Sequence, residues 1–409
     1  MPFPHALRAL NHRDFRRFYV AQLLALVGGW MQAVAQAWLV LQLTDSPFRL
    51  GLISTLQFSP ILVFSVVTGA VADRLPKRAL LVATQTMLAC QAFLLGALVA
   101  TGRVEYWHVA ALGLALGFAN VLDQPARQSF VMEMVGKGDV ANAVALNSAA
   151  FNAARIVGPA VAGVLIAQVG VGPAFFVNSA GFVGVILTLG RLEARGLPAR
   201  AGRATMLEEI LEGLRYARRT PRLLLALGLV LIVSLCVFNF TVYVPLLART
   251  VLGLGAEGFG FLMAALGVGA VAGALTVGGR GSREPGPGPG RMFRSAALAF
   301  AALGGLGLSR HVWMATPLLV VTGYFGIVLM ASCNTSMQLG APDALRGRVM
   351  SLYTWVTGGV FPIGAFLVGS ISQAWGVSVA FLWNGTLGLL ALAGIMLWWR
   401  RRARAPLGA

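Results

Sequence analysis

The chain has 409 residues, of which 57% are hydrophobic and only 11% are charged, and its formal net charge is +18. A soluble domain carries about 25% charged residues, so this composition excludes a soluble enzyme, a disordered protein and a disulfide scaffold, and it leaves an integral membrane protein. The three cysteines lie inside apolar runs and predict neither a disulfide nor a metal site.

Apolar runs long enough to cross a bilayer recur along the whole chain. A hydrocarbon core of about 30 Å needs roughly 20 apolar residues per helix. Because these runs are long and apolar all round, they exclude the short, alternating strands of a membrane barrel. We therefore expect an all-α membrane protein with twelve transmembrane helices, at 17–43, 50–72, 79–101, 107–130, 141–168, 173–190, 222–248, 258–279, 293–309, 313–338, 349–374 and 378–399.

The basic residues predict which loops face the cytoplasm. With the N-terminus inside, 26 of the 32 lysines and arginines lie in cytoplasmic segments or at their edges, and four lie in outside loops. This bias follows the positive-inside rule, which accounts for the net charge without a nucleic-acid partner. We expect a multi-pass protein of the bacterial inner (plasma) membrane, surrounded by membrane lipids, with both termini in the cytoplasm.

The longest predicted cytoplasmic connection, 191–221, separates six spans from six. Within it, Thr205 and Glu208 form a capping-box pattern before a helix with one apolar face, which we expect to lie on the inner membrane face. The pentapeptide AFFVN at 174–178 is similar to AFLWN at 380–384. The sequence therefore predicts an N-terminal bundle at 1–190, a linker at 191–221 and a C-terminal bundle at 222–409.

A basic motif joins the second and third spans, GAVADRLPKR at 69–78. It resembles the signature of the major facilitator superfamily, G-x-x-x-D-R-x-x-[KR]-[KR], at the loop where that family carries it. The resemblance implies two pseudo-symmetric six-helix bundles and transport by alternating access. It also implies a conformational latch, formed here by Gly69, Asp73, Arg74, Lys77, Arg78, Asp123 and Arg127.

Two further stretches, DQPARQSF at 123–130 and RIVGPAVAG at 155–163, resemble one branch of this superfamily. That branch contains the enterobactin exporter and drug:proton antiporters. Within the second stretch, Gly158, Pro159 and Gly163 resemble the motif associated with antiporters. The resemblance thus implies export in exchange for protons.

Asp123 is the acid that the prediction places well inside a span, and charges there are costly. In one interpretation it binds the coupling proton. In the other it is a latch partner of Arg127, which lies four positions further along the same helix face, and of the basic residues after the second span. The sequence leaves both interpretations open.

Polar residues in the spans are candidates for a central substrate cavity. Arg155, near mid-depth, would bind an anionic group of the substrate, hydrogen-bond to helix carbonyls or reach Asp123. The remaining candidates lie in spans of both halves: Gln32, Gln36, Asn120, Asn239, Tyr243, Tyr324 and Asn334.

Signatures of catalysis are missing from the sequence. The four histidines form no triad or metal cluster, and no phosphate-binding loop of the G-x-x-x-x-G-K-[ST] type occurs. We expect no enzyme activity, no metal and no cofactor. The resemblance implies a monomeric secondary active transporter that exports a drug-like, siderophore-like or other amphipathic small molecule, driven by the proton gradient. The alternatives are an uncoupled or lipid-moving facilitator of the same fold, and a non-transporting membrane receptor.

Overall fold

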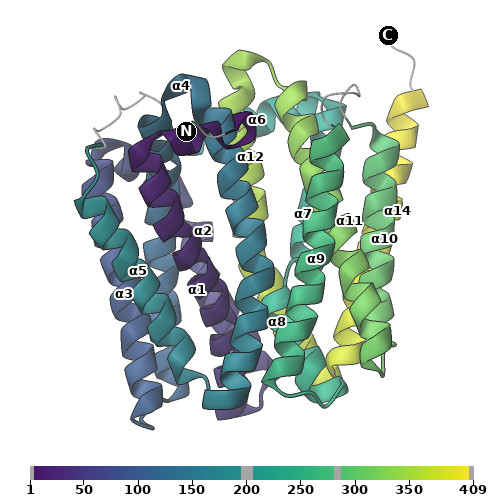
Figure 1. The fold of residues 1–409 in the computed structure, drawn as a ribbon. Coiled ribbons are helices and arrows are strands. Elements are labelled where there is room, and N and C mark those ends of the chain that lie inside the picture. The colour runs from purple at the N-terminus through teal and green to yellow at the C-terminus, as the bar shows by residue number, and fades with distance from the viewer. Residues whose placement is uncertain (1–3, 195–205, 281–286, 405–409) are drawn as a thin grey trace. The chain divides into compact units, whose positions relative to one another are not determined.

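The computed structural model describes residues 4–194, 206–280 and 287–404, and within these ranges all regular structure is helical (Figure 1). The chain forms two compact units that are discontinuous in sequence. Unit 1 contains residues 1–45, 59–203 and 255–264, and unit 2 contains residues 46–58, 204–254 and 265–409. Two helices therefore contribute to both units.

Unit 1 is a helical bundle in which α1 and α3 each pack against α4 and α5 (Figure 1). Its core is mainly aliphatic and includes three almost completely buried phenylalanines, Phe15, Phe18 and Phe130. Its elements are η1 (His5–Asn11), α1 (Arg13–Thr44), α2 (Pro47–Arg74) from residue 59 on, α3 (Lys77–Ala100), α4 (Tyr106–Val169) and α5 (Gly172–Gly190).

The 64-residue helix α4 holds two of the predicted spans and is kinked between them. At the kink, Gly136 has φ 66° and ψ 169°, a conformation that glycine adopts readily and other residues rarely do. Next to the kink, the Arg8 guanidinium donates to the Gly138 carbonyl over 2.9 Å and forms an ion pair with Asp139. These contacts hold η1 against the middle of α4.

Unit 2 contains two predicted spans that the structure divides. The run 222–248 becomes α7, α8 and η2, with a break at residues 237–239, and the run 349–374 becomes α12 and α13, with a break at Val360. Pro362 follows the second break and occupies the first turn of α13, where the missing N–H of proline costs nothing. The elements are α6 (Met206–Arg219), α7 (Pro221–Cys236), α8 (Phe240–Leu246), η2 (Leu247–Val251), α9 (Ala256–Arg280) from residue 265 on, α10 (Pro289–Leu306), α11 (Val312–Gly340), α12 (Asp343–Gly359), α13 (Phe361–Trp375) and α14 (Val377–Arg404).

Eleven described helical segments are long and apolar enough to cross a membrane, and they match eleven of the twelve predicted runs. The remaining run, 293–309, falls on α10. This helix has only 18 residues, and its first two turns contain Arg291 and Arg294, which lower its mean hydropathy. It nevertheless packs along α11 and α14 within unit 2 (Figure 1).

The amphipathic helix predicted in the linker is present as α6, and it packs against α12 and α7. Glu212 of α6 forms an ion pair with Arg348 of α12. A Cβ atom at Gly213 would lie 2.6 Å from the Arg348 carbonyl oxygen, so the two backbones meet where α6 has no side chain. Thr205, the predicted capping residue, lies outside the described residues.

Candidate functional site

The buried carboxylate of Asp123 is held by three partners inside unit 1. Its side chain has no exposed surface and forms an ion pair with Arg127, one turn further along α4. From α3, the Thr84 hydroxyl donates to Asp123 Oδ1 over 2.9 Å, and the Gln85 amide donates to the same oxygen over 2.8 Å. A buried charge needs a counter-charge and hydrogen-bond partners, and this cluster supplies both. The cluster therefore balances one buried negative charge between α3 and α4.

Two residues of the predicted latch, Lys77 and Arg78, lie in the first turn of α3. The Lys77 ammonium lies 3.6 Å from Glu133 Oε2 on α4. The Arg78 guanidinium donates to the carbonyl oxygens of Gly190 and Leu192, over 2.8 and 3.1 Å, which caps the end of α5. Gly69, Asp73 and Arg74 belong to α2, but their side chains lie outside the described part of the chain.

Gln32 takes part in a chain of buried amides that joins three helices of unit 1. Asn178 of α5 donates to Gln32 Oε1 over 2.6 Å, and Gln32 Nε2 donates to Gln91 Oε1 of α3 over 3.0 Å. A Cβ atom at Gly28 would lie 2.7 Å from Asn178 Oδ1, so the glycine makes room for the asparagine. Gln36 is also buried. Both predicted glutamines thus lie in the packed interior of the bundle.

Arg155 lies on α4 beside an aromatic pair. Its Nε atom is buried and makes no hydrogen bond with any described residue. Phe151 precedes it by one turn on the same face and meets Trp30 of α1 edge to face, with ring centroids 5.8 Å apart. The Phe151 side chain is 45% exposed. This part of unit 1 therefore offers a cation next to an accessible aromatic ring.

The predicted antiporter-like residues lie at close helix crossings. A Cβ atom at Gly158 would lie 2.5 Å from Trp30 Cβ, and one at Gly163 would lie 3.0 Å from the Cα atom of Gly260. A Cβ atom at Gly260 would in turn lie 2.5 Å from the carbonyl oxygen of Pro159. Hence α4 approaches α1 through Gly158, and it approaches the start of α9 through Pro159 and Gly163.

Unit 2 contains the same spacing of glycines. Gly364 and Gly369 are five residues apart, as Gly158 and Gly163 are. A Cβ atom at Gly364 would lie 2.4 Å from Asn239 Nδ2, and one at Gly369 would lie 2.9 Å from the Cα atom of Gly51. The repeated spacing and the repeated type of contact support an internal duplication.

The predicted cavity residues of unit 2 all have neighbours within that unit. The Asn239 amide donates to the Leu235 carbonyl over 2.8 Å at the break after α7. The Tyr243 ring stacks on Phe381 at 4.6 Å between centroids. The Tyr324 hydroxyl donates to the Thr276 hydroxyl over 3.2 Å, and Asn334 Oδ1 accepts from Gln338 over 2.6 Å. Asn120, in unit 1, is partly buried on α4.

Sequence reasoning missed the residues that complete the two polar clusters of unit 1. These are Thr84 and Gln85 beside Asp123, and Gln91 and Asn178 beside Gln32. Their signal was present in the sequence, since each is a polar residue within an apolar run. Buried polar groups need hydrogen-bond partners, so each of them points to a partner on a neighbouring helix.

Comparison with known proteins identifies the family. Residues 5–405 match the transmembrane secretion effector family. The chain belongs to this family, within the major facilitator superfamily. It is 29% identical over 386 residues to the multidrug efflux pump Tap of Mycolicibacterium fortuitum, covering 88% of this chain and 90% of that protein. It is also 29% identical over 393 residues to the enterobactin exporter EntS of Escherichia coli O6:K15:H31, covering 95% and 92%.

Solved structures show the same fold at low sequence identity. A bacterial homologue of the human lysosomal transporter Spinster has a TM-score of 0.76 and 12% identity, covering 95% of this chain and 96% of that one. The nucleoside transporter NupG has a TM-score of 0.76 and 11% identity, covering 94% and 98%. The expected major facilitator fold is confirmed, and the chain is a multi-pass efflux transporter rather than an enzyme.

Proposed function

We propose that this transporter exports an amphipathic small molecule in exchange for protons, by alternating access, as a monomer in a bacterial inner membrane with both termini in the cytoplasm. Two relatives support the kind of cargo, since one is a multidrug efflux pump and the other an enterobactin exporter. The arginine-rich segments predicted to be cytoplasmic support the orientation.

The buried charge of Asp123 is the observation that carries proton coupling. Among the side chains that the structure describes, Asp123 is the one buried acid. A proton on Asp123 would cancel the ion pair with Arg127 and weaken the hydrogen bonds from Thr84 and Gln85. Because these partners lie on α3 and α4, protonation would change the packing of two helices in unit 1. Such a link between a proton and helix packing is what an antiporter needs.

The same cluster also supports the alternative function, an uncoupled facilitator. With one arginine and two donors, both oxygens of the Asp123 carboxylate have partners. In that case, the cluster fixes α3 to α4, and Lys77 and Arg78 add contacts with Glu133 before the kink of α4 and with the end of α5.

Collapse of the proton gradient separates the two proposals. We expect protein in sealed vesicles, with a fluorescent amphipathic dye as cargo, to concentrate the dye only while a proton gradient exists. A proton ionophore should then abolish accumulation. Vesicles without protein are the control for dye that crosses the bilayer unaided. Accumulation that persists after the ionophore would contradict coupling, and equilibration independent of any gradient would support the facilitator.

Arg155 and the neighbouring aromatic pair lead us to propose that this region binds an anionic group of the cargo. We expect Arg155→Gln to reduce the transport of an aromatic carboxylate dye about tenfold, the effect of one charge-assisted hydrogen bond. An aromatic cation of similar size should be transported at nearly the wild-type rate. Arg155→Lys, which keeps the charge, should retain most of the carboxylate transport. Equal losses for both dyes in Arg155→Gln would show that Arg155 supports the fold instead.

A further inference from the structure

A cavity of about 310 Å³ lies within unit 2 at the start of α10. Its lining includes Arg291, Arg294 and Ser295 from α10, Tyr324 and Phe325 from α11, and Thr276 from α9. Of these residues, only Tyr324 is among the candidates for the substrate cavity, and the proposed function uses none of them. The cavity is of the size of small-ligand sites, which begin at about 300 Å³.

One wall of this cavity is polar and positively charged. Arg291 and Arg294 are three residues apart, so they lie on one face of α10. Arg294 is exposed and makes no hydrogen bond or ion pair with any residue that the structure describes. The lining also contains the hydroxyls of Tyr324 and Thr276, and the first donates to the second over 3.2 Å. The wall thus combines two guanidinium groups with hydroxyls, which is a favourable environment for a phosphate.

The sequence around the cavity is strongly basic. Residues 265–409 contain eleven arginines and two acids, Glu284 and Asp343. An anion bound at Arg294 would therefore add negative charge to a basic segment.

The rest of the lining is apolar. Leu298, one turn beyond Arg294, is 45% exposed, whereas Val328 of α11 is buried. Val277 and Phe325 complete this apolar part of the lining. A free phosphate gains nothing from contact with apolar side chains. A phospholipid does, because the first carbons of its acyl chains lie beside the headgroup and pack against such side chains.

We propose that this cavity binds an anionic phospholipid, with the phosphate at Arg291 and Arg294 and the acyl chains along Leu298. Basic pockets between transmembrane helices on the cytoplasmic side are suited to such headgroups, and the start of α10 lies on the side predicted to be cytoplasmic. This site is independent of the cargo and of the proton.

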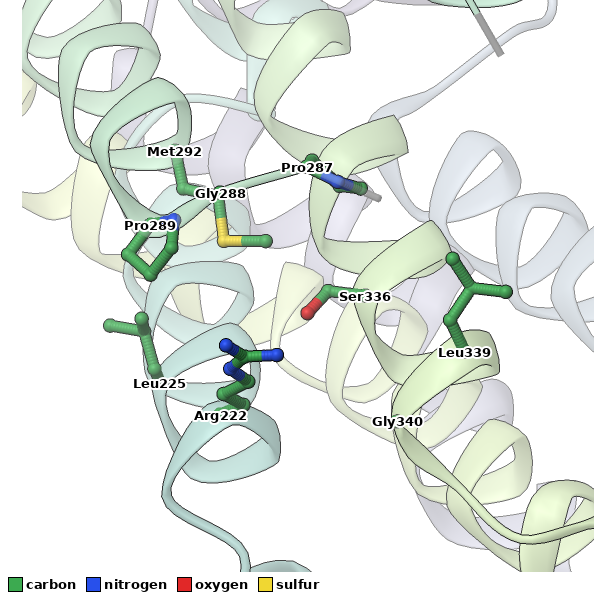
Figure 2. Close-up of a pocket in the computed structure, with 9 residues that line it drawn as sticks. All are labelled: Arg222, Leu225, Pro287, Gly288, Pro289, Met292, Ser336, Leu339 and Gly340. Atoms are coloured by element: carbon green, nitrogen blue, oxygen red, sulfur yellow. The ribbon is translucent and has the colours of Figure 1, made fainter. Parts of the chain in front are cut away.

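A second cavity of similar size provides a matched control. It has a volume of about 300 Å³ and lies between α7, α10 and α11. Figure 2 shows Arg222 and Ser336 pointing toward one another across it. Because its lining contains a single arginine, Arg222→Gln removes the same charge as Arg294→Gln from a neighbouring cavity.

The test measures the thermal stability of the detergent-purified transporter with added phosphatidylglycerol. A ligand that binds the folded form raises the melting temperature. We therefore expect phosphatidylglycerol to raise the melting temperature of the transporter, and phosphatidylcholine to raise it much less. Arg294→Gln should weaken the apparent affinity for phosphatidylglycerol about tenfold. Arg294→Lys and Arg222→Gln should bind it as the wild type does. Arg294 is exposed and unpaired among the described residues, so its variants should fold, which the melting temperature without lipid verifies.

Three results would overturn the proposal. If Arg294→Gln leaves the apparent affinity for phosphatidylglycerol unchanged, or if Arg222→Gln lowers it equally, the lipid does not bind in this cavity. Equal stabilisation by phosphatidylcholine would remove the need for an anionic headgroup. Inorganic phosphate that reproduces the shift at the same concentration would assign the arginines to a soluble anion. Native mass spectrometry, which counts bound lipids directly, should show phosphatidylglycerol lost from Arg294→Gln and retained by Arg222→Gln.

Discussion

Arg127→Gln is expected to destabilise the transporter more than any other single loss of charge in unit 1. The variant leaves the completely buried carboxylate of Asp123 without its ion-pair partner. Breaking a buried pair by removing one partner costs about 3–5 kcal/mol, because the remaining charge stays uncompensated. Asp123→Asn should cost less, since the hydrogen bond from Thr84 can persist to a neutral amide oxygen.

The double variant Asp123→Asn/Arg127→Gln completes the test, because it removes both charges and should recover part of the stability lost in Arg127→Gln. The melting temperature in detergent measures the stability of each of the three variants. Arg348→Gln is the matched control, since it breaks the partly exposed pair with Glu212; exposed pairs are worth about 0–1 kcal/mol. If Arg127→Gln costs no more than Arg348→Gln, the buried carboxylate of Asp123 does not depend on Arg127 for its stability.

Gly260→Val is expected to reduce transport at least about fivefold. The Cβ atom of the valine would lie 2.5 Å from the Pro159 carbonyl oxygen and 2.8 Å from the Cα atom of Gly163. Both neighbours are backbone atoms and cannot rotate away, so the start of α9 must move from α4. Overpacking of this kind costs about 1–3 kcal/mol, which corresponds to roughly a five- to 150-fold change in an equilibrium constant.

Dye export in vesicles measures this effect, and Gly184→Val is its control. Gly184 lies in the middle of α5, and a Cβ atom there would have no neighbour within 4 Å. Both variants place a β-branched residue in a helix at the same cost. The difference in dye export between them therefore measures the effect of the crossing between α4 and α9. Similar export by the two variants would mean that the contact between α4 and α9 is dispensable for transport.

Much of this fold could be predicted from the sequence because a bilayer leaves few choices. A membrane span must satisfy its own backbone, which makes it a helix of about 20 apolar residues. The kink at Gly136 could be placed between two spans, yet its conformation could not be predicted. The break around Asn239 was missed, because nothing in the apolar run 222–248 distinguishes a continuous helix from an interrupted one.

The direction in which a polar side chain points could not be predicted. Gln32 was expected in a substrate cavity, and in the structure both ends of its amide are bonded to α3 and α5. Its role in transport stays untested, but its partners Gln91 and Asn178 lie 59 and 146 residues away in the chain. Pairings over such distances depend on how the helices pack, which no local pattern records. The pair of Asp123 and Arg127 was predictable because it lies within one turn of one helix.

Proton movement in sealed vesicles tests most directly whether Asp123 couples cargo to protons. A pH-sensitive dye trapped inside the vesicles reports protons that cross when cargo is added. We predict that cargo moves protons through the wild type, and that Asp123→Asn still binds cargo and exchanges it across the membrane without moving protons. Undiminished proton movement in Asp123→Asn would contradict the account and leave Asp123 as a structural partner of Arg127.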